Sequence, residues 1–331
     1  MAVGQKLANQ LTELERIFLI ITNSCNSRCL LCDYWRKRTK HFLPVSFIQK
    51  NILPLIIKYR IKVACITGGE PTLHPRLPKI LKIIKKTGVS VTLITNCTNL
   101  NTIFEKIESY VDGYMLPLDS DNDSLYYEIR GVNNFHEVIS WPRKIKECNP
   151  SAKVIFSCLV QKKNISKLVN IYLLASKLPI DGIVFKVPEL RPYCFGRSNF
   201  VADETLDNAY LTRNDILNLR KEFRKILILD HKKKILLQKK DVFERFIKYF
   251  EFLRGKKINF EDKMCKIPFN SITIDELKNI RPCFYLPFFI PFSRVVKDPI
   301  NNFYLRSIRE KLLKNERFRK ENCSYCFQFQ Y

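Results

Sequence analysis

Short apolar runs alternate with longer amphipathic segments from residue 16 to about residue 187. The apolar runs are rich in Val, Ile and Phe and lie at residues 16–22, 63–67, 90–95, 113–118, 153–160 and 182–186. Gly, Asn or Asp bounds them, as is typical of strands buried in a parallel sheet. The segments between them carry apolar residues at positions i, i+3, i+4 and i+7. That spacing predicts helices at residues 45–59, 75–87, 100–110, 135–147 and 165–176.

This alternation predicts an α/β fold built from βαβ units with right-handed crossovers. Six such units fit an open, partial (β/α)6 barrel of the TIM type better than a closed barrel of eight strands. In either arrangement we expect the loops that follow the strands to carry the chemistry.

The pattern is less regular after the sixth predicted strand. A loop at residues 188–203 precedes two predicted helices, at 212–225 and 241–254, the second of which ends at Gly255. Further on, the segments 271–274 and 279–283 flank a polar turn and predict a small hairpin.

The chain has 331 residues, more than the ~150 used as a prior for one domain, so we predict two domains. The first covers residues 1–230, with its barrel core at 16–187. The second covers residues 231–331 and holds a linker helix followed by a small α+β domain.

Composition narrows the class of protein. Hydrophobic residues make up 46% of the chain, enough for a buried core. Residues 1–16 contain no apolar segment of the secretory type, and the most apolar stretch, 284–292, is broken by Pro287 and Pro291. That stretch is far shorter than the ~20 residues needed to cross a bilayer. We therefore expect a cytoplasmic protein without a membrane span.

The formal net charge is +25, from 57 basic and 32 acidic residues. Such an excess can mark nucleic-acid binding, but the basic residues are spread along the chain rather than gathered in one segment. Nucleic acid is therefore an unlikely partner in the leading hypothesis. It remains central to the alternative hypothesis, a zinc-binding, basic RNA-binding protein without redox chemistry.

Three cysteines follow the first predicted strand: Cys25, Cys29 and Cys32. Iron–sulfur clusters are normally held by four thiolates, so this C-x3-C-x2-C run predicts a cubane cluster whose fourth iron is free to bind another ligand. Zinc sites usually pair two C-x2-C units, and no second pair lies nearby in the sequence.

A second set of four cysteines lies near the C-terminus: Cys265, Cys283, Cys323 and Cys326. The first two bracket the predicted hairpin, and the last two form a C-x2-C pair. Their spacing suits a structural zinc ion and a fully ligated iron–sulfur cluster equally well.

Further motifs follow successive strands of the predicted barrel. They are Gly68-Gly69-Glu70-Pro71, Thr95-Asn96, Leu118-Asp119 with Ile129-Arg130-Gly131, and Lys163-Asn164. Together with the opening Cys25-Asn26-Ser27-Arg28-Cys29, they occur in an order that resembles the radical S-adenosylmethionine (SAM) superfamily. The four-cysteine tail resembles the SPASM/Twitch auxiliary domain of that superfamily.

The resemblance implies a radical SAM enzyme, oxidoreductase-like or peptide-modifying. A [4Fe-4S] cluster on the first three cysteines would reductively cleave SAM and form a 5′-deoxyadenosyl radical that takes hydrogen from a substrate. The substrate would be a peptide or a small molecule such as a sugar or aminocyclitol. The tail would hold a second [4Fe-4S] cluster for electron transfer, and an external donor such as flavodoxin or ferredoxin would supply electrons.

The resemblance also assigns roles to individual residues. SAM-binding positions implied by the motifs are Gly68, Gly69, Glu70, Pro71, Thr95, Asn96, Asp119, Arg130 and Asn164. Glu70 or its neighbouring backbone would receive the ammonium group of SAM, and Arg130 would pair with its carboxylate. Cys194, in the loop after the sixth strand, is a candidate hydrogen donor to a substrate radical.

Overall fold

The computed structural model describes residues 10–197, 201–258, 265–295, 298–323 and 326. Within these residues, nine strands form one sheet in the order β6-β5-β4-β3-β2-β1-β7-β8-β9. The strands are β1 (Arg16–Ile20), β2 (Val63–Thr67), β3 (Ser90–Ile94), β4 (Gly113–Pro117), β5 (Lys153–Leu159), β6 (Gly182–Lys186), β7 (Ser271–Ile274), β8 (Asn279–Arg281) and β9 (Ile290–Pro291).

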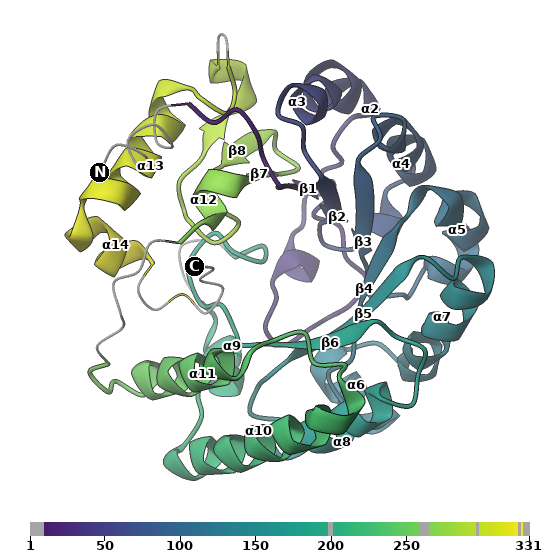
Figure 1. Ribbon diagram of the computed structural model, residues 1–331, viewed down its shortest axis with the longest axis vertical. Coiled ribbons are helices and arrows are strands. Elements are labelled where there is room, and N and C mark those ends of the chain that lie inside the picture. The colour runs from purple at the N-terminus through teal and green to yellow at the C-terminus, as the bar shows by residue number, and fades with distance from the viewer. Residues whose placement is uncertain (1–9, 198–200, 259–264, 296–297, 324–325, 327–331) are drawn as a thin grey trace.

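Strands β1 to β6 are parallel to their neighbours and curve into an open barrel with helices along its outer face (Figure 1). The predicted partial (β/α)6 barrel is therefore confirmed. The helices are α2 (Val45–Phe47), α3 (Leu53–Lys58), α4 (Leu77–Lys85), α5 (Leu100–Ile107), α6 (Asp123–Arg130), α7 (Phe135–Cys148), α8 (Leu168–Ala175), α9 (Asp203–Ala209), α10 (Arg213–Lys233), α11 (Lys240–Leu253), α12 (Ile267–Asn270), α13 (Phe303–Lys314) and α14 (Glu316–Asn322).

Alternation along the strands separates the two faces of the sheet. In β5, Val154, Phe156 and Cys158 are buried on the outer, helix-covered side, whereas Ser157 and Leu159 are partly exposed and line a cavity inside the barrel. Successive side chains of a strand point to opposite faces. The outward set forms the hydrophobic core, and the inward set is left to form a site.

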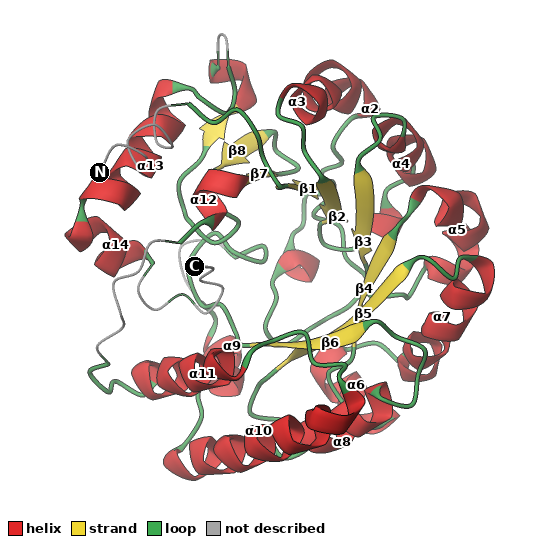
Figure 2. Ribbon diagram, in the orientation of Figure 1, coloured by secondary structure: helices red, strands yellow, loops and turns green. Residues whose placement is uncertain are grey.

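The sheet continues past the barrel into the C-terminal part of the chain. Strand β7 pairs in parallel with β1, with Arg16 opposite Ser271 and Leu19 opposite Ile274. The predicted hairpin is present as the antiparallel pair β7–β8. Figure 2 shows these strands beside β1, with α12, α13 and α14 next to them. The sheet thus contains strands from both sides of the predicted boundary at residues 230 and 231. The division of the chain into two domains stays a prediction.

The opposite edge of the sheet is covered by the segment after α10. The Ile183 N–H donates to the Ile235 carbonyl at 2.8 Å, and the Leu237 N–H donates to the Ile183 carbonyl at 3.1 Å. The Gln238 side chain then bonds both backbone groups of Phe185. These contacts satisfy polar groups that an edge strand would otherwise expose.

Candidate functional site

One cavity of about 350 Å³ occupies the barrel mouth and interior. Its wall includes all three cysteines of the loop after β1, which are Cys25, Cys29 and Cys32, and it reaches Cys283 of the tail. The two cysteine sets predicted from sequence therefore border a single space.

The loop of residues 25–32, here called the cluster loop, is fixed to the end of α6 by its backbone. The Arg28 N–H donates to the Arg130 carbonyl at 2.8 Å, and the Leu30 N–H donates to the Ile129 carbonyl at 3.1 Å. Helix α6 ends at Gly131, which has the left-handed φ of 64° that favours glycine. A Cβ at Gly131 would approach the Arg28 Cβ to 2.6 Å, so this position also needs a glycine for space.

The three thiols of the cluster loop are shielded from solvent and influence one another. Burial raises the pKa of the Cys25 thiol to about 12. Burial also raises the pKa of Cys32, and the neighbouring Cys29 and Cys25 thiols add to that rise. Metal ligation requires thiolates, so cluster binding at this loop must release protons. Among the described residues, no group of three or more His, Cys, Asp and Glu side chains is arranged around a single metal ion.

The Gly-Gly pair after β2 packs against the backbone that leads into the cluster loop. A Cβ at Gly68 would lie 2.3 Å from the Thr22 carbonyl oxygen, and one at Gly69 would lie 2.3 Å from the Ser24 carbonyl oxygen. The Glu70 N–H donates to that same Ser24 oxygen at 2.7 Å. The pair therefore sets how closely the two loops approach. Both glycines also line the cavity.

Replacing Gly69 by alanine is expected to displace the cluster loop. The clash is with backbone, which cannot rotate away, and overpacking of this kind costs about 1–3 kcal/mol. We expect Gly69→Ala to lower both the melting temperature and the iron retained after anaerobic reconstitution. Gly113→Ala is the matched control, because a Cβ there meets only ordinary contacts, the nearest being Thr92 Oγ1 at 3.4 Å. Wild-type iron content in Gly69→Ala would contradict this role.

Glu70 is fully buried, and the protein itself occupies its carboxylate. Oε1 accepts from the Thr72 N–H at 3.0 Å, the Thr72 hydroxyl at 2.6 Å and the Thr95 hydroxyl at 2.7 Å. Oε2 accepts from the Asn96 N–H at 2.6 Å. Glu70 does not line the cavity, nor does Pro71, so the Glu70 carboxylate joins the loops after β2 and β3 rather than facing a ligand.

Asn96 connects the loop after β3 to the cluster loop. Its amide Nδ2 donates to the Ser27 hydroxyl at 2.7 Å and to Asn26 Oδ1 at 3.0 Å, and lies 4.0 Å from Cys25 Sγ. Thr95 and Asn96 both line the cavity. The predicted Thr95-Asn96 motif thus lies beside the first cysteine.

Asp119 and Arg130 form a buried ion pair at the wall of the cavity. Arg130 Nη1 donates to Asp119 Oδ2 at 3.0 Å, and Asp119 Oδ1 accepts from the Leu159 N–H at 2.7 Å. Arg130 Nε is buried without a hydrogen-bond partner, which is rare for such a group and points to a missing acceptor. Asn164 does not line the cavity; its amide donates to the Asp119 carbonyl at 2.8 Å and the Leu159 carbonyl at 2.9 Å.

Several cavity residues were not predicted from the sequence: Arg16, Phe18, Gln161, Lys186, Glu189 and Tyr285. Lys186 is the last residue of β6, and its position in the strand alternates with the buried Phe185. The sequence could have identified Lys186, because it is a charged residue at the carboxyl end of a barrel strand. Its place in the strand alternation also faces the inside of the barrel.

The four tail cysteines are close enough to influence one another. Burial raises the pKa of Cys323 to about 12, and nearby Cys326 and Cys265 raise it further. The pKa of Cys283 is raised by burial first and then by the same two neighbours. The Cys326 N–H donates to the Cys323 carbonyl at 2.9 Å, as in a tight turn.

Cys194 lies away from the cavity. Its side chain is buried, and its Sγ lies 3.6 Å from the Tyr285 carbonyl oxygen and 4.0 Å from that of Phe284. Cys194 is not among the residues that line the cavity. Its predicted role as a hydrogen donor gains no support from this placement.

Comparison with known proteins identifies the family. Residues 19–175 match the family described as "Radical SAM superfamily". Residues 19–175 therefore form a radical SAM domain. A probable GTP 3′,8-cyclase of Sulfurisphaera tokodaii is 30% identical over 198 residues, which is 59% of this chain and 62% of that protein. The chain therefore matches about three fifths of the length of this relative.

Solved structures show the same fold at low sequence identity. Streptococcus suis SuiB bound to SAM has a TM-score of 0.64 at 14% identity, covering 96% of this chain and 70% of SuiB. SuiB bound to its precursor peptide SuiA has a TM-score of 0.63 at 15% identity, covering 93% of this chain and 67% of SuiB. In the described part of the chain, no helix has the length and apolar character needed to span a bilayer.

A radical SAM domain implies a [4Fe-4S] cluster and SAM, and the residues of the cavity wall fit both. Three partly buried thiols without a fourth cysteine in their loop match a cluster that keeps one iron for SAM. Arg130 lines the same cavity, and its guanidinium can donate to a carboxylate there. The zinc-binding, RNA-binding alternative is not supported by the family match.

Proposed function

We propose that this protein reductively cleaves SAM at a [4Fe-4S] cluster on Cys25, Cys29 and Cys32, and oxidises or rearranges a substrate bound in the barrel. The carrying observation is that one cavity touches both the cluster loop and Cys283 of the tail. When bound, the cluster supplies one electron to the S–C5′ bond of SAM, which releases methionine and a 5′-deoxyadenosyl radical that takes a hydrogen atom from the substrate.

The cavity wall supplies groups for each part of SAM. Asp119 holds Arg130 through Nη1 and fixes the guanidinium at the cavity wall, where Arg130 can receive a carboxylate. The backbone of Gly68 and Gly69 lies at the cavity wall and can meet the ammonium group. Thr95, Asn96 and the inward side of β3 and β4 complete the wall.

Glu70 and Asn164 act as positioning residues in this proposal. Glu70 fixes the loops after β2 and β3 through Thr72, Thr95 and Asn96. Asn164 fixes Asp119 through its backbone, and Asp119 in turn fixes Arg130. Substitutions of Glu70 or Asn164 would therefore change the affinity for SAM indirectly, because neither side chain contacts SAM in this proposal.

The tail is proposed to hold a second [4Fe-4S] cluster on Cys265, Cys283, Cys323 and Cys326. Support comes from the mutual influence of these thiols on their pKa values. In addition, Arg191 Nη2 lies 3.5 Å from Cys326 Sγ, and a cationic donor of this kind stabilises a thiolate ligand. Four thiolates leave no iron open to substrate, so electron transfer is the proposed role.

The substrate class remains a peptide or a small molecule. The similarity to a probable GTP 3′,8-cyclase favours a nucleotide-like small molecule, and the fold likeness to a peptide-bound SuiB leaves a peptide substrate open. We propose a flavodoxin or ferredoxin as electron donor and a cytoplasmic location.

The proposal can be tested by electron paramagnetic resonance on protein reconstituted and reduced anaerobically. We expect a reduced [4Fe-4S] signal that changes shape when SAM is added, because SAM would bind the iron that lacks a protein ligand. Stoichiometric zinc without iron, or an iron signal indifferent to SAM, would contradict the proposal.

A further inference from the structure

The charges that line the cavity are paired, with one exception. Each lining carboxylate has a basic partner within salt-bridge distance; the pairs are Glu15–Arg16, Asp119–Arg130 and Glu189–Arg191. Lys186 also lines the cavity, and no carboxylate of the described residues lies within 4.0 Å of its Nζ. Among the described residues, Lys186 is therefore a cation of the cavity wall without a direct ion-pair partner.

Among the described residues, the carboxylate whose charge acts on Lys186 is that of Asp119, which lies beyond salt-bridge distance. Its Nζ lies 3.4 Å from the thioether sulfur of Met115, a weak acceptor. Asp119 is nearby, but its oxygens already serve Arg130 and the Leu159 N–H. Cys65 also lies close, and burial raises the pKa of its thiol to about 11, so it is neutral at physiological pH. Burial lowers the pKa of Lys186, as expected for a cation without a partner.

An uncompensated charge in an enclosed site costs stability, and proteins retain such groups mainly where a ligand binds. The carboxylate of SAM is accounted for in the proposed function by Arg130, which lines the same cavity. Lys186 is therefore left for a different ligand.

A second unpartnered group lies next to Lys186 in the sheet. The Val160 N–H donates to the Lys186 carbonyl at 2.7 Å, which sets the loop after β5 beside the end of β6. Gln161 follows directly, is buried, and lines the cavity, and its Oε1 is a buried acceptor without a hydrogen-bond partner among the described residues. A cation and a buried amide thus occupy adjacent strand ends.

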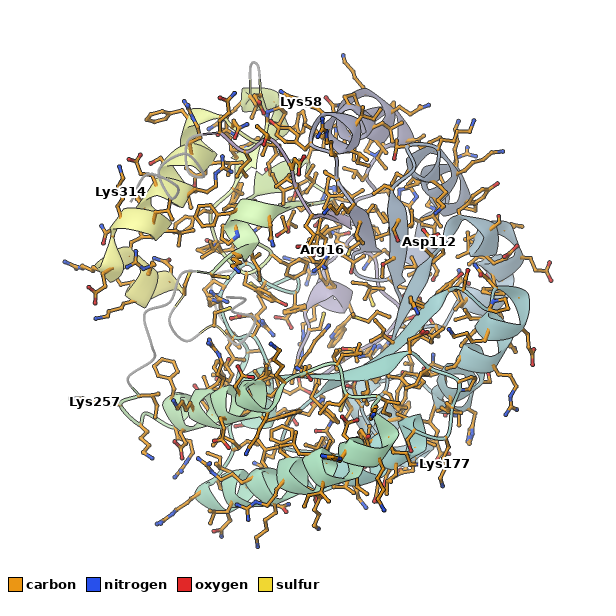
Figure 3. The ribbon with its side chains drawn as sticks, viewed as in Figure 1. Arg16, Lys58, Asp112, Lys177, Lys257 and Lys314 are labelled. Atoms are coloured by element: carbon orange, nitrogen blue, oxygen red, sulfur yellow. The ribbon has the colours of Figure 1, made fainter. Side chains whose placement is uncertain are left out.

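We propose that Lys186 binds an anionic group of the substrate, a phosphate or a carboxylate, beside Gln161 at the neighbouring strand end. The inference rests on the proposed function in that it takes this cavity as the substrate site. Another cation of the cavity wall is Arg16, which lies near the centre of the view in Figure 3, whereas Lys177 lies near the edge of the molecule. Its pairing with Glu15 makes Arg16 a weaker competitor for an anion.

The test measures anion binding directly and does not depend on turnover. Holoenzyme with bound SAM is titrated calorimetrically with inorganic pyrophosphate and, separately, with succinate. We expect the wild type to bind one of them, and Lys186→Met to weaken that binding at least about tenfold, as for loss of a hydrogen bond to a charged group. Binding of pyrophosphate would indicate a phosphorylated substrate, and binding of succinate would indicate a substrate with a carboxylate group.

Three further variants make the result specific. Lys186→Arg should keep binding within a few fold, and Lys177→Met, at an exposed position, should behave as the wild type. The Lys186→Met variant should have a melting temperature no lower than that of the wild type, because the substitution removes an unpaired charge. If this variant does not fold, the Lys186→Gln variant is titrated in its place. Gln161→Leu should leave SAM affinity unchanged.

The proposal is overturned if the wild type binds neither anion, or if Lys186→Met binds the anion as the wild type does. It is also overturned if Lys186→Met loses SAM affinity instead, which would assign Lys186 to the cofactor. SAM cleavage without Lys186-dependent anion binding would reject this inference and leave the proposed function standing. Anion binding that depends on Lys186, in a protein that does not cleave SAM, would reject the proposed function and leave this inference standing.

Discussion

Cys29→Ala is expected to abolish SAM cleavage. The variant leaves two thiolates in the cluster loop, too few to hold a cubane that normally has four cysteine ligands and here has three. We expect iron from this site to be lost and 5′-deoxyadenosine to fall below about one thousandth of the wild-type amount, a loss of about 4 kcal/mol or more in barrier terms. Product is measured by mass spectrometry after anaerobic reduction.

Cys148→Ala is the matched control for that change. Cys148 is exposed at the end of α7 and lies outside both cysteine sets, so its loss should change neither iron content nor cleavage. Substantial 5′-deoxyadenosine from Cys29→Ala, with iron retained, would show that the cluster is held elsewhere.

Replacing Cys323 and Cys326 together by alanine is expected to remove about half of the iron, from about eight to about four atoms per chain. SAM cleavage without substrate should persist, because the cluster loop is anchored to α6 and to the loop after β2 rather than to the tail. Substrate turnover should be lost, because the tail cluster would no longer relay electrons from the cavity.

The continuous sheet makes a stability measurement necessary for this double variant. Strand β7 pairs with β1, which leads directly into the cluster loop, so unfolding of the tail would disturb both sites. A melting temperature near that of the wild type identifies a specific loss of the second cluster. A folded variant that keeps all its iron and full turnover would contradict the second-cluster proposal.

The sequence predicted the barrel well because local patterns determine its parts. The apolar runs at 63–67 and 182–186 coincide with β2 and β6, since a short buried strand carries its own signature in Val and Ile content. Helix α6 was not predicted, although Asn122 caps its start and Gly131 ends it, because its eight residues carry mostly polar side chains.

The pairing of β7 with β1 could not be read from the sequence. It joins segments about 255 residues apart, and no local pattern records which strand edge a hairpin will meet. The hydrogen-bond partners of Glu70 could not be read from the sequence for a related reason. The motif places Glu70 beside the cluster loop, but only the fold shows that Thr72, Thr95 and Asn96 satisfy its carboxylate.

The most direct test of the central claim is the formation of 5′-deoxyadenosine. Wild-type protein is reconstituted anaerobically, its iron and sulfide are measured, and it is then incubated with dithionite and SAM. The arrangement of Cys25, Cys29 and Cys32 around a cavity with a free Arg130 donor predicts 5′-deoxyadenosine and methionine in equal amounts. No 5′-deoxyadenosine from protein with its full iron content would contradict the account.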